Sequence, residues 1–172
     1  MMKPKEMKRE SWYYFKNLKE TMDPFVEKFL KIPSFLEQIK SLKLAILKTN
    51  KALEETGSFS FCKNCATKGT ICCGEGLEWK LSPEEFFINL CLFKLKEKEL
   101  YLENPTSETC LFLGQQGCSL ELVPLFCRNF FCTPLSQHLG LKNLTYIQQS
   151  MEEEAILSFN ISEYLKNLMI NT

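Results

Sequence analysis

Eight cysteines are concentrated in two short parts of this chain, and their spacing suits metal ligation. Four of them lie within twelve residues, in the order Cys62-x2-Cys65 followed by Cys72-Cys73. The two-residue gap in the first pair lets both sulfurs reach one metal ion across a tight turn. Zinc and iron both accept soft thiolate donors, so this segment predicts either zinc or an iron–sulfur cluster.

The second group of cysteines occupies residues 110–132. Its members are Cys110, Cys118, Cys127 and Cys132. Gly114, Gly117 and Pro124 interrupt this stretch, as expected where backbone turns must point several side chains inward. Neither group is diagnostic alone. Together they supply eight sulfurs from two loop-rich segments, which predicts a metal centre but leaves zinc and iron–sulfur open.

Individual cysteines carry alternative interpretations. Cys91 lies among apolar residues in a helical run and is predicted to be a buried, inert thiol. Adjacent Cys72 and Cys73 project differently from the backbone, so either one ligates while the other packs, or both serve a multinuclear centre. Cys132 suits a ligand and a core position equally. His138 is the single histidine, which excludes sites needing two histidines from one chain, and it is predicted to be a surface or capping residue.

The order of these blocks resembles the YkgJ-type cysteine cluster family, described as zinc- or iron-chelating. The resemblance covers roughly residues 59–135. The matching blocks are Cys62-x2-Cys65, Cys72-Cys73, Cys110-Leu-Phe-Leu, Gly117-Cys118-Ser119-Leu120, Pro124-x2-Cys127-Arg128-Asn129-Phe130 and the helix start Ser82-Pro83-Glu84-Glu85. The chain departs from the family pattern at Leu111, Glu121 and Val123, where the family has Pro, Tyr and Arg.

Arg128 follows a cysteine directly and has two interpretations. Beside a thiolate, its charge would favour the ionised sulfur and hydrogen-bond to an anionic centre. Alternatively, it forms an ordinary surface ion pair.

Helices are expected to frame the cysteine segments. Asp23-Pro24 and Pro33-Ser34 suit helix starts, and a helical stripe runs from Phe35 to Leu53 before Gly57. Ser82-Pro83-Glu84-Glu85 forms a capping box for a helix to about Leu102, which Asn104-Pro105 ends.

The remaining segments are expected to be loops or short elements. Residues 58–81 are expected to be loop with a strand-like piece over 77–81, and residues 106–140 to be mostly loop and turn. A short strand is predicted over Leu144–Ile147, and Ser150 with Glu153 is predicted to cap a tail helix.

These expectations define the fold class as mainly α, with a loop-rich cysteine cluster and at most a few short strands. Residues 1–57 form a helical N-terminal extension, and residues 58–140 form the cysteine-cluster metal-binding domain. Residues 141–172 add a C-terminal strand and helix that pack on the same core.

Composition limits the cellular setting and the partners. The formal net charge is zero, with 21 basic and 21 acidic residues, which argues against nucleic-acid binding. The chain shows neither a secretory apolar run nor a membrane-length apolar stretch, so a cytoplasmic location without membrane contact is expected. In that reducing compartment, nine cysteines favour metal or redox chemistry over disulfides.

Two functions remain open from the sequence. The first is a metal-binding protein that holds zinc or an iron–sulfur cluster and supports a redox or cofactor-dependent role. The second is a structural zinc module whose helical extensions bind a protein partner. The sequence contains no Walker loop, dinucleotide fingerprint or credible Ser-His-Asp set, so it predicts no particular enzymatic activity.

Overall fold

The computed structural model describes residues 4–102 and 109–170 of the chain. Helices account for most of these residues, as the sequence predicted. In chain order the elements are α1 Pro4–Leu30, α2 Pro33–Glu55, α3 Ser58–Thr67, the 3-10 helix η1 Leu77–Lys80, α4 Pro83–Leu95, β1 Leu113–Gly114, β2 Gly117–Cys118, α5 Leu125–Arg128 and α6 Thr133–Ile170. The mainly α fold class is therefore confirmed.

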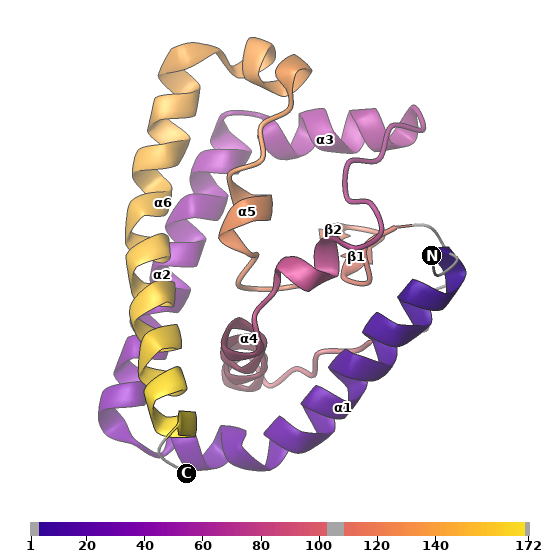
Figure 1. Ribbon diagram of the computed structural model, residues 1–172. Coiled ribbons are helices and arrows are strands. Elements are labelled where there is room, and N and C mark those ends of the chain that lie inside the picture. The colour runs from indigo at the N-terminus through magenta and orange to yellow at the C-terminus, as the bar shows by residue number, and fades with distance from the viewer. Residues whose placement is uncertain (1–3, 103–108, 171–172) are drawn as a thin grey trace.

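Two long helices, α2 and α6, run side by side along one edge of the molecule (Figure 1). The buried stripe of α2 includes Phe35, Ile39 and Leu42, which recur at the helical period predicted from the sequence. Gly57 ends this segment with φ +77°, the left-handed conformation expected at a helix C-terminus.

The N-terminal helix α1 packs on α4, and α4 is seen almost end-on near the middle of the view (Figure 1). The prediction of a helix start at Pro24 is wrong, because Pro24 lies inside α1. Phe15 and Val26 are buried on either side of this proline. Their packing against the core holds both halves of the helix, although proline removes one backbone hydrogen bond.

The α4 helix begins as its capping box predicted. The Glu85 amide donates to Ser82 Oγ at 3.1 Å, and the Ser82 amide donates to a Glu85 carboxylate oxygen at 2.9 Å. The helix ends at Leu95 rather than at about Leu102. Glu97 adopts φ +54°, which turns the chain out of the helix. The predicted terminator at 104–105 lies outside the described residues.

The segment 58–81 contains two helices where the sequence predicted loop and strand. The α3 helix carries Cys62 and Cys65, and η1 replaces the predicted strand. Within η1, the side chain of Glu78 is buried. Its carboxylate accepts hydrogen bonds from Ser11 Oγ at 2.8 Å and from the Gly76 amide at 3.0 Å. These two bonds compensate the buried carboxylate for its lost hydration.

The tail helix also begins much earlier than predicted. No strand forms over Leu144–Ile147 in the described chain, because α6 includes this segment. Ile147 and Met151 are buried four residues apart, which is helical spacing. Ser150 does not cap a helix start, since its hydroxyl donates back to the Tyr146 carbonyl at 2.9 Å. The element breaks at Gly140, whose φ of 68° and ψ of 169° are non-helical.

Two clusters of buried residues make up the core. The larger cluster joins α1, α2, α4 and the far end of α6, with Phe15, Phe86 and Phe112 among its members. The smaller cluster lies where α2 meets the start of α6, and it includes Leu53 and Leu135. No described helix is long and apolar enough to pass through a lipid bilayer.

Candidate metal centre

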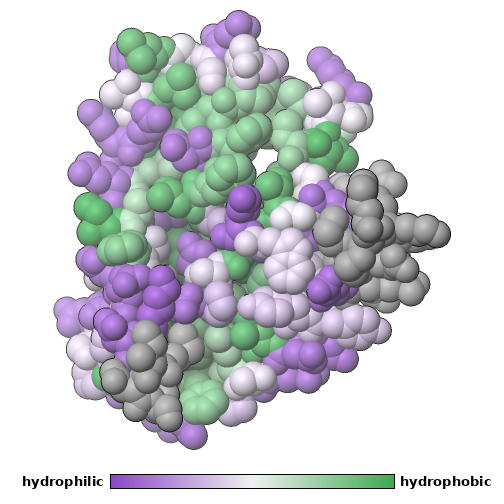
Figure 2. Space-filling model, in the orientation of Figure 1, coloured by the Kyte–Doolittle hydropathy of each residue, from purple (hydrophilic) through white to green (hydrophobic). Residues whose placement is uncertain are grey.

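The cysteine-bearing elements face one another across one side of the molecule. The helix α3 lies at the top of this side, the loop 68–76 descends from it, and α5 and the β1–β2 hairpin lie opposite (Figure 1). The space-filling view is hollowed beneath α3 in the same region (Figure 2). All nine cysteines are free thiols, and the eight predicted ligands are exposed or half-buried.

Four cysteines gather at the α3 end of this side, and we call them the α3 set. They are Cys62, Cys65, Cys72 and Cys132. The pKa of Cys62 is raised by burial and then by the charges that Cys132, Cys72, Cys65 and Cys73 would carry as thiolates. Burial also raises the pKa of Cys72, with contributions from Cys132 and Cys65 and a hydrogen bond between the Cys72 and Cys132 side chains.

The other four cysteines gather around the β1–β2 hairpin, and we call them the hairpin set. They are Cys73, Cys110, Cys118 and Cys127. Burial raises the pKa of Cys110 to about 12 and that of Cys118 to about 11, and the neighbouring Cys73 thiolate adds to both shifts. Burial and Cys73 also raise the pKa of Cys127.

Backbone pairing brings the hairpin set together. The Cys110 amide donates to the Cys73 carbonyl at 2.9 Å, beside an antiparallel bridge between Gly74 and Thr109. The strands β1 and β2 pair Leu113 with Cys118. These contacts align segments that lie far apart in the chain. Spacing alone could not reveal which cysteines they bring together.

Thiols are suitable donors for zinc or iron, but their positions do not form a complete coordination shell. In the described parts of the chain, no three His, Cys, Asp or Glu side chains are grouped tightly enough to hold an ion. Thiols with raised pKa values are largely protonated near neutral pH, and neighbouring thiolates would repel one another. A bound cation would offset that repulsion and favour deprotonation, which is the usual requirement of a thiolate site.

Arg128 lies in a buried ion pair rather than in the surface pair considered from the sequence. Its Nε donates to Glu154 at 3.1 Å, and a terminal nitrogen donates to the Asn50 side chain at 2.9 Å. Both ionised side chains are at least nine-tenths buried. The Arg128 charge also acts on Cys118, where it opposes the burial-driven rise in pKa. Arg128 thus anchors α5 to α2 and α6 while placing a positive charge near the hairpin set.

Asn89 is a positioning residue that the sequence analysis missed. It is fully buried, and its amide nitrogen donates to the carbonyls of Glu85 and Leu122 at 2.9 and 3.0 Å. Its side-chain oxygen accepts from the amides of Glu121 and Leu122. These four hydrogen bonds fix the loop between Cys118 and Cys127 against α4. A polar residue inside an otherwise apolar helix was the available sequence signal.

Three other sequence expectations can be compared with the structure. Cys91 is fully buried in the larger core cluster, and burial raises its pKa to about 12, which confirms its assignment to the core. His138 stacks on Phe61 of α3 with ring centroids 4.9 Å apart. Cys132 is half-buried and packs on the smaller core cluster while also contacting Cys72.

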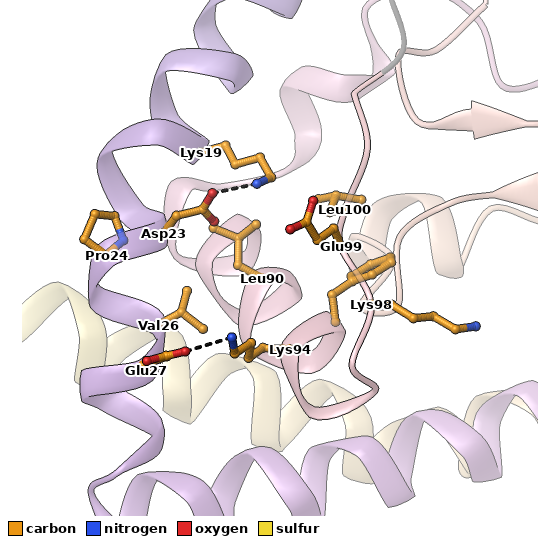
Figure 3. Close-up of a pocket in the computed structure, with 11 residues that line it drawn as sticks. Lys19, Asp23, Pro24, Val26, Glu27, Leu90, Lys94, Lys98, Glu99 and Leu100 are labelled. Carbon is orange, nitrogen blue, oxygen red and sulfur yellow. Dashed lines mark hydrogen bonds and ion pairs between the residues drawn. The ribbon is translucent and has the colours of Figure 1, made fainter.

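A separate surface pocket of about 300 Å³ lies between α1 and α4, away from the cysteines. Ion pairs join Lys19 to Asp23 and Lys94 to Glu27 at its wall (Figure 3). Lys98 and Glu99 also line this pocket.

The chain matches no protein-family model, no curated protein and no solved structure. The resemblance to the YkgJ-type family therefore stays a prediction from the residues quoted above.

Proposed function

We propose that this protein binds a metal, as zinc or an iron–sulfur cluster, through its clustered cysteine thiolates in the cytoplasm. The observation that carries the proposal is that the eight thiols lie in two neighbouring groups, the α3 set and the hairpin set, whose members act on one another. The resemblance to the YkgJ-type family supports the same chemistry. When bound, zinc would cross-link these segments, whereas an iron–sulfur cluster would add electron transfer.

The chain's own residues support such a role in three ways. Asn89 and the Gly74–Thr109 bridge hold the cysteine loops in place. Arg128 supplies a positive charge near Cys118, which favours its thiolate form. Protein atoms around the thiols partly desolvate them, and this burial is the largest cause of each raised pKa.

Metal analysis of anaerobically purified protein tests this proposal. A brown protein with stoichiometric iron and sulfide would support a cluster, whereas colourless protein with bound zinc would support a zinc site. Because zinc replaces iron during overexpression, anaerobic reconstitution with iron and sulfide is the necessary control. Absence of both metals after purification and reconstitution would refute the proposal.

Single substitutions should locate the metal. We expect Cys65→Ser and Cys127→Ser each to lower the metal content, because each removes a thiolate donor. Cys91→Ala is the matched control and should retain full metal content, since Cys91 lies in the apolar core. Elemental analysis per folded protein would measure the difference. Loss of metal from Cys91→Ala with an unchanged circular dichroism spectrum would contradict this assignment.

A structural zinc module that binds a protein partner is the second candidate function. Apolar side chains near the cysteines favour it. Phe126, within α5, is 55% exposed, and Phe130, just after this helix, is 53% exposed. Aromatic side chains left in solvent beside a metal site suit an interface. A redox-inactive zinc protein that nevertheless co-purifies with one stoichiometric partner would favour this alternative.

A further inference from the structure

The geometry points to two separate four-thiolate metal sites, one formed by the α3 set and one by the hairpin set. The peptide between Cys72 and Cys73 divides them. This inference rests on the proposed function and specifies which thiols share each metal. It also resolves how adjacent cysteines can both be ligands, because each serves a different site.

Backbone contacts place Cys72 and Cys73 in different surroundings. At the end of α3, the Thr70 amide donates to the Cys65 carbonyl at 3.0 Å, which turns the chain back toward that helix. Cys132, just before α6, is the charged neighbour with the largest effect on the Cys72 thiol. The Cys73 carbonyl instead accepts from the Cys110 amide, next to the bridge that leads into the hairpin. The chain therefore passes from one set to the other within two residues.

The two sets also rest on different parts of the core. Cys132 packs against the smaller buried cluster, together with Phe61 of α3. Cys110 packs against the larger cluster, which includes Phe112 and the buried residues of α4. A single centre for all eight thiols would have to draw these two anchored groups together. Two centres require only that the four thiols within each set move closer together.

The charged surroundings of the two sets are different. Within the α3 set, other thiols are the charged neighbours that act on Cys62 and Cys72. The hairpin set has charged neighbours of both signs, namely Arg128 and Lys80 as cations and Glu78 and Glu85 as anions. The two sets also act on each other: Cys72 is the charged neighbour that raises the pKa of the adjacent Cys73, and Cys73 contributes least of the four thiols that act on Cys62. Metal ions in the two sites should therefore give distinguishable spectra.

Cadmium-113 binding to the full-length, reduced protein tests this division. Cd²⁺ is a soft, spin-active probe for thiolate sites, so each site gives its own resonance. We expect two bound Cd²⁺ ions and two resonances for the unsubstituted chain. Cys65→Ser and Cys72→Ser should both lose the same resonance, leaving about one ion per chain. Cys73→Ser and Cys118→Ser should both lose the other one.

The pair Cys72→Ser and Cys73→Ser is the most informative comparison, because these variants differ by one position yet should lose different ions. Cys91→Ala should retain both resonances. Far-UV circular dichroism of each variant checks its helical content. If Cys72→Ser fails to fold, Cys65→Ser takes its place in the comparison, and if Cys73→Ser fails to fold, Cys118→Ser takes its place.

The possible outcomes distinguish a failure of the two-site division from a failure of metal binding itself. One shared resonance, lost in every variant, would overturn the two-site division while leaving metal binding intact. Identical losses in Cys72→Ser and Cys73→Ser would also overturn it. Failure of the unsubstituted chain to bind Cd²⁺, Zn²⁺ or reconstituted iron would instead refute metal binding itself.

Discussion

At the residue scale, buried polar side chains hold the cysteine loops to the helical frame. Asn89 links α4 to the 121–122 backbone, and Glu78 links η1 to Ser11 of α1. Arg128 ties α5 to Glu154 of α6. Each of these groups loses hydration on folding and regains hydrogen bonds within the protein. The position of the candidate ligands therefore depends on residues that are not themselves ligands.

Replacing Asn89 should have a large cost in stability. Asn89→Ala removes the hydrogen-bonding oxygen and nitrogen of the side-chain amide. The buried Leu122 amide and carbonyl then lose their partners. We expect the free energy of unfolding to fall by about 2–4 kcal/mol, from the cost of buried unsatisfied groups. Urea unfolding of the metal-free protein would measure this change.

Asn160→Ala, on the exposed side of α6, is the control for that measurement and should change stability by no more than about 0.5 kcal/mol. Equal effects of the two substitutions would show that the Asn89 hydrogen bonds do not stabilise the loop.

At the element scale, α6 is divided by its glycine. Gly140 combines φ 68° with ψ 169°, a region open almost only to glycine. The seven residues before it carry Leu135 and Leu139 into the smaller cluster, and the long segment after it packs on α2. This break lets the start of α6 leave the α2 axis and present Cys132 beside α3.

Gly140→Ala should strain this break. A Cβ at that position would meet no atom within 4 Å, so the cost is conformational rather than steric crowding with neighbours. We expect a loss of about 1–3 kcal/mol in the free energy of unfolding, measured by urea denaturation. Gly74→Ala is the control, because Gly74 has ordinary backbone angles and equally open space. A Gly140→Ala protein as stable as the control would contradict the strained conformation.

The sequence correctly predicted those helix starts, helix ends and buried helix faces that depend on residues close together in the chain. The capping box at Ser82, the stripe from Phe35 and the left-handed Gly57 involve neighbouring residues, so the sequence alone contained them. The first part of α6 was missed because residues 106–140 were expected to be mostly loop and turn, and the short apolar run at 144–147 fits a strand as well as a buried helical face. Its burial against α2 is decided by tertiary packing.

The candidate ligands show the same limit. Their residue types and clustering predicted eight metal donors, and Cys91 was separated from them by its apolar neighbours. The division into an α3 set and a hairpin set depends on the Gly74–Thr109 bridge and on contact between α3 and the start of α6. Those are long-range contacts, which spacing along the chain does not encode.

At the scale of the whole molecule, the raised thiol pKa values link metal binding to pH. Each thiol that binds must first lose its proton, and burial raises the pKa of Cys110 to about 12 and of Cys118 to about 11. Below these values, a rise in pH removes competing protons and favours the metal-bound form. Binding should therefore strengthen with pH across the neutral range.

We expect zinc affinity to rise from pH 6 to pH 8, by up to about tenfold per pH unit for each proton displaced. Competition with a zinc chelator would measure the affinity. Calorimetry in two buffers of different ionisation enthalpy would count the protons released. Cys91→Ala should show the same pH dependence, because its thiol is not displaced by metal. A pH-independent affinity would show that protonated thiols are not the species that zinc displaces.

The aromatic stack on η1 has a practical consequence. Trp79 lies with its ring centroid 5.2 Å from that of Tyr14 and 6.0 Å from that of Phe15, and it is one of two tryptophans in the chain. Its helical turn contacts α5, which carries Cys127. The indole is thus an intrinsic fluorophore built into the support of one cysteine loop, and its emission can follow closure of that loop without any added label.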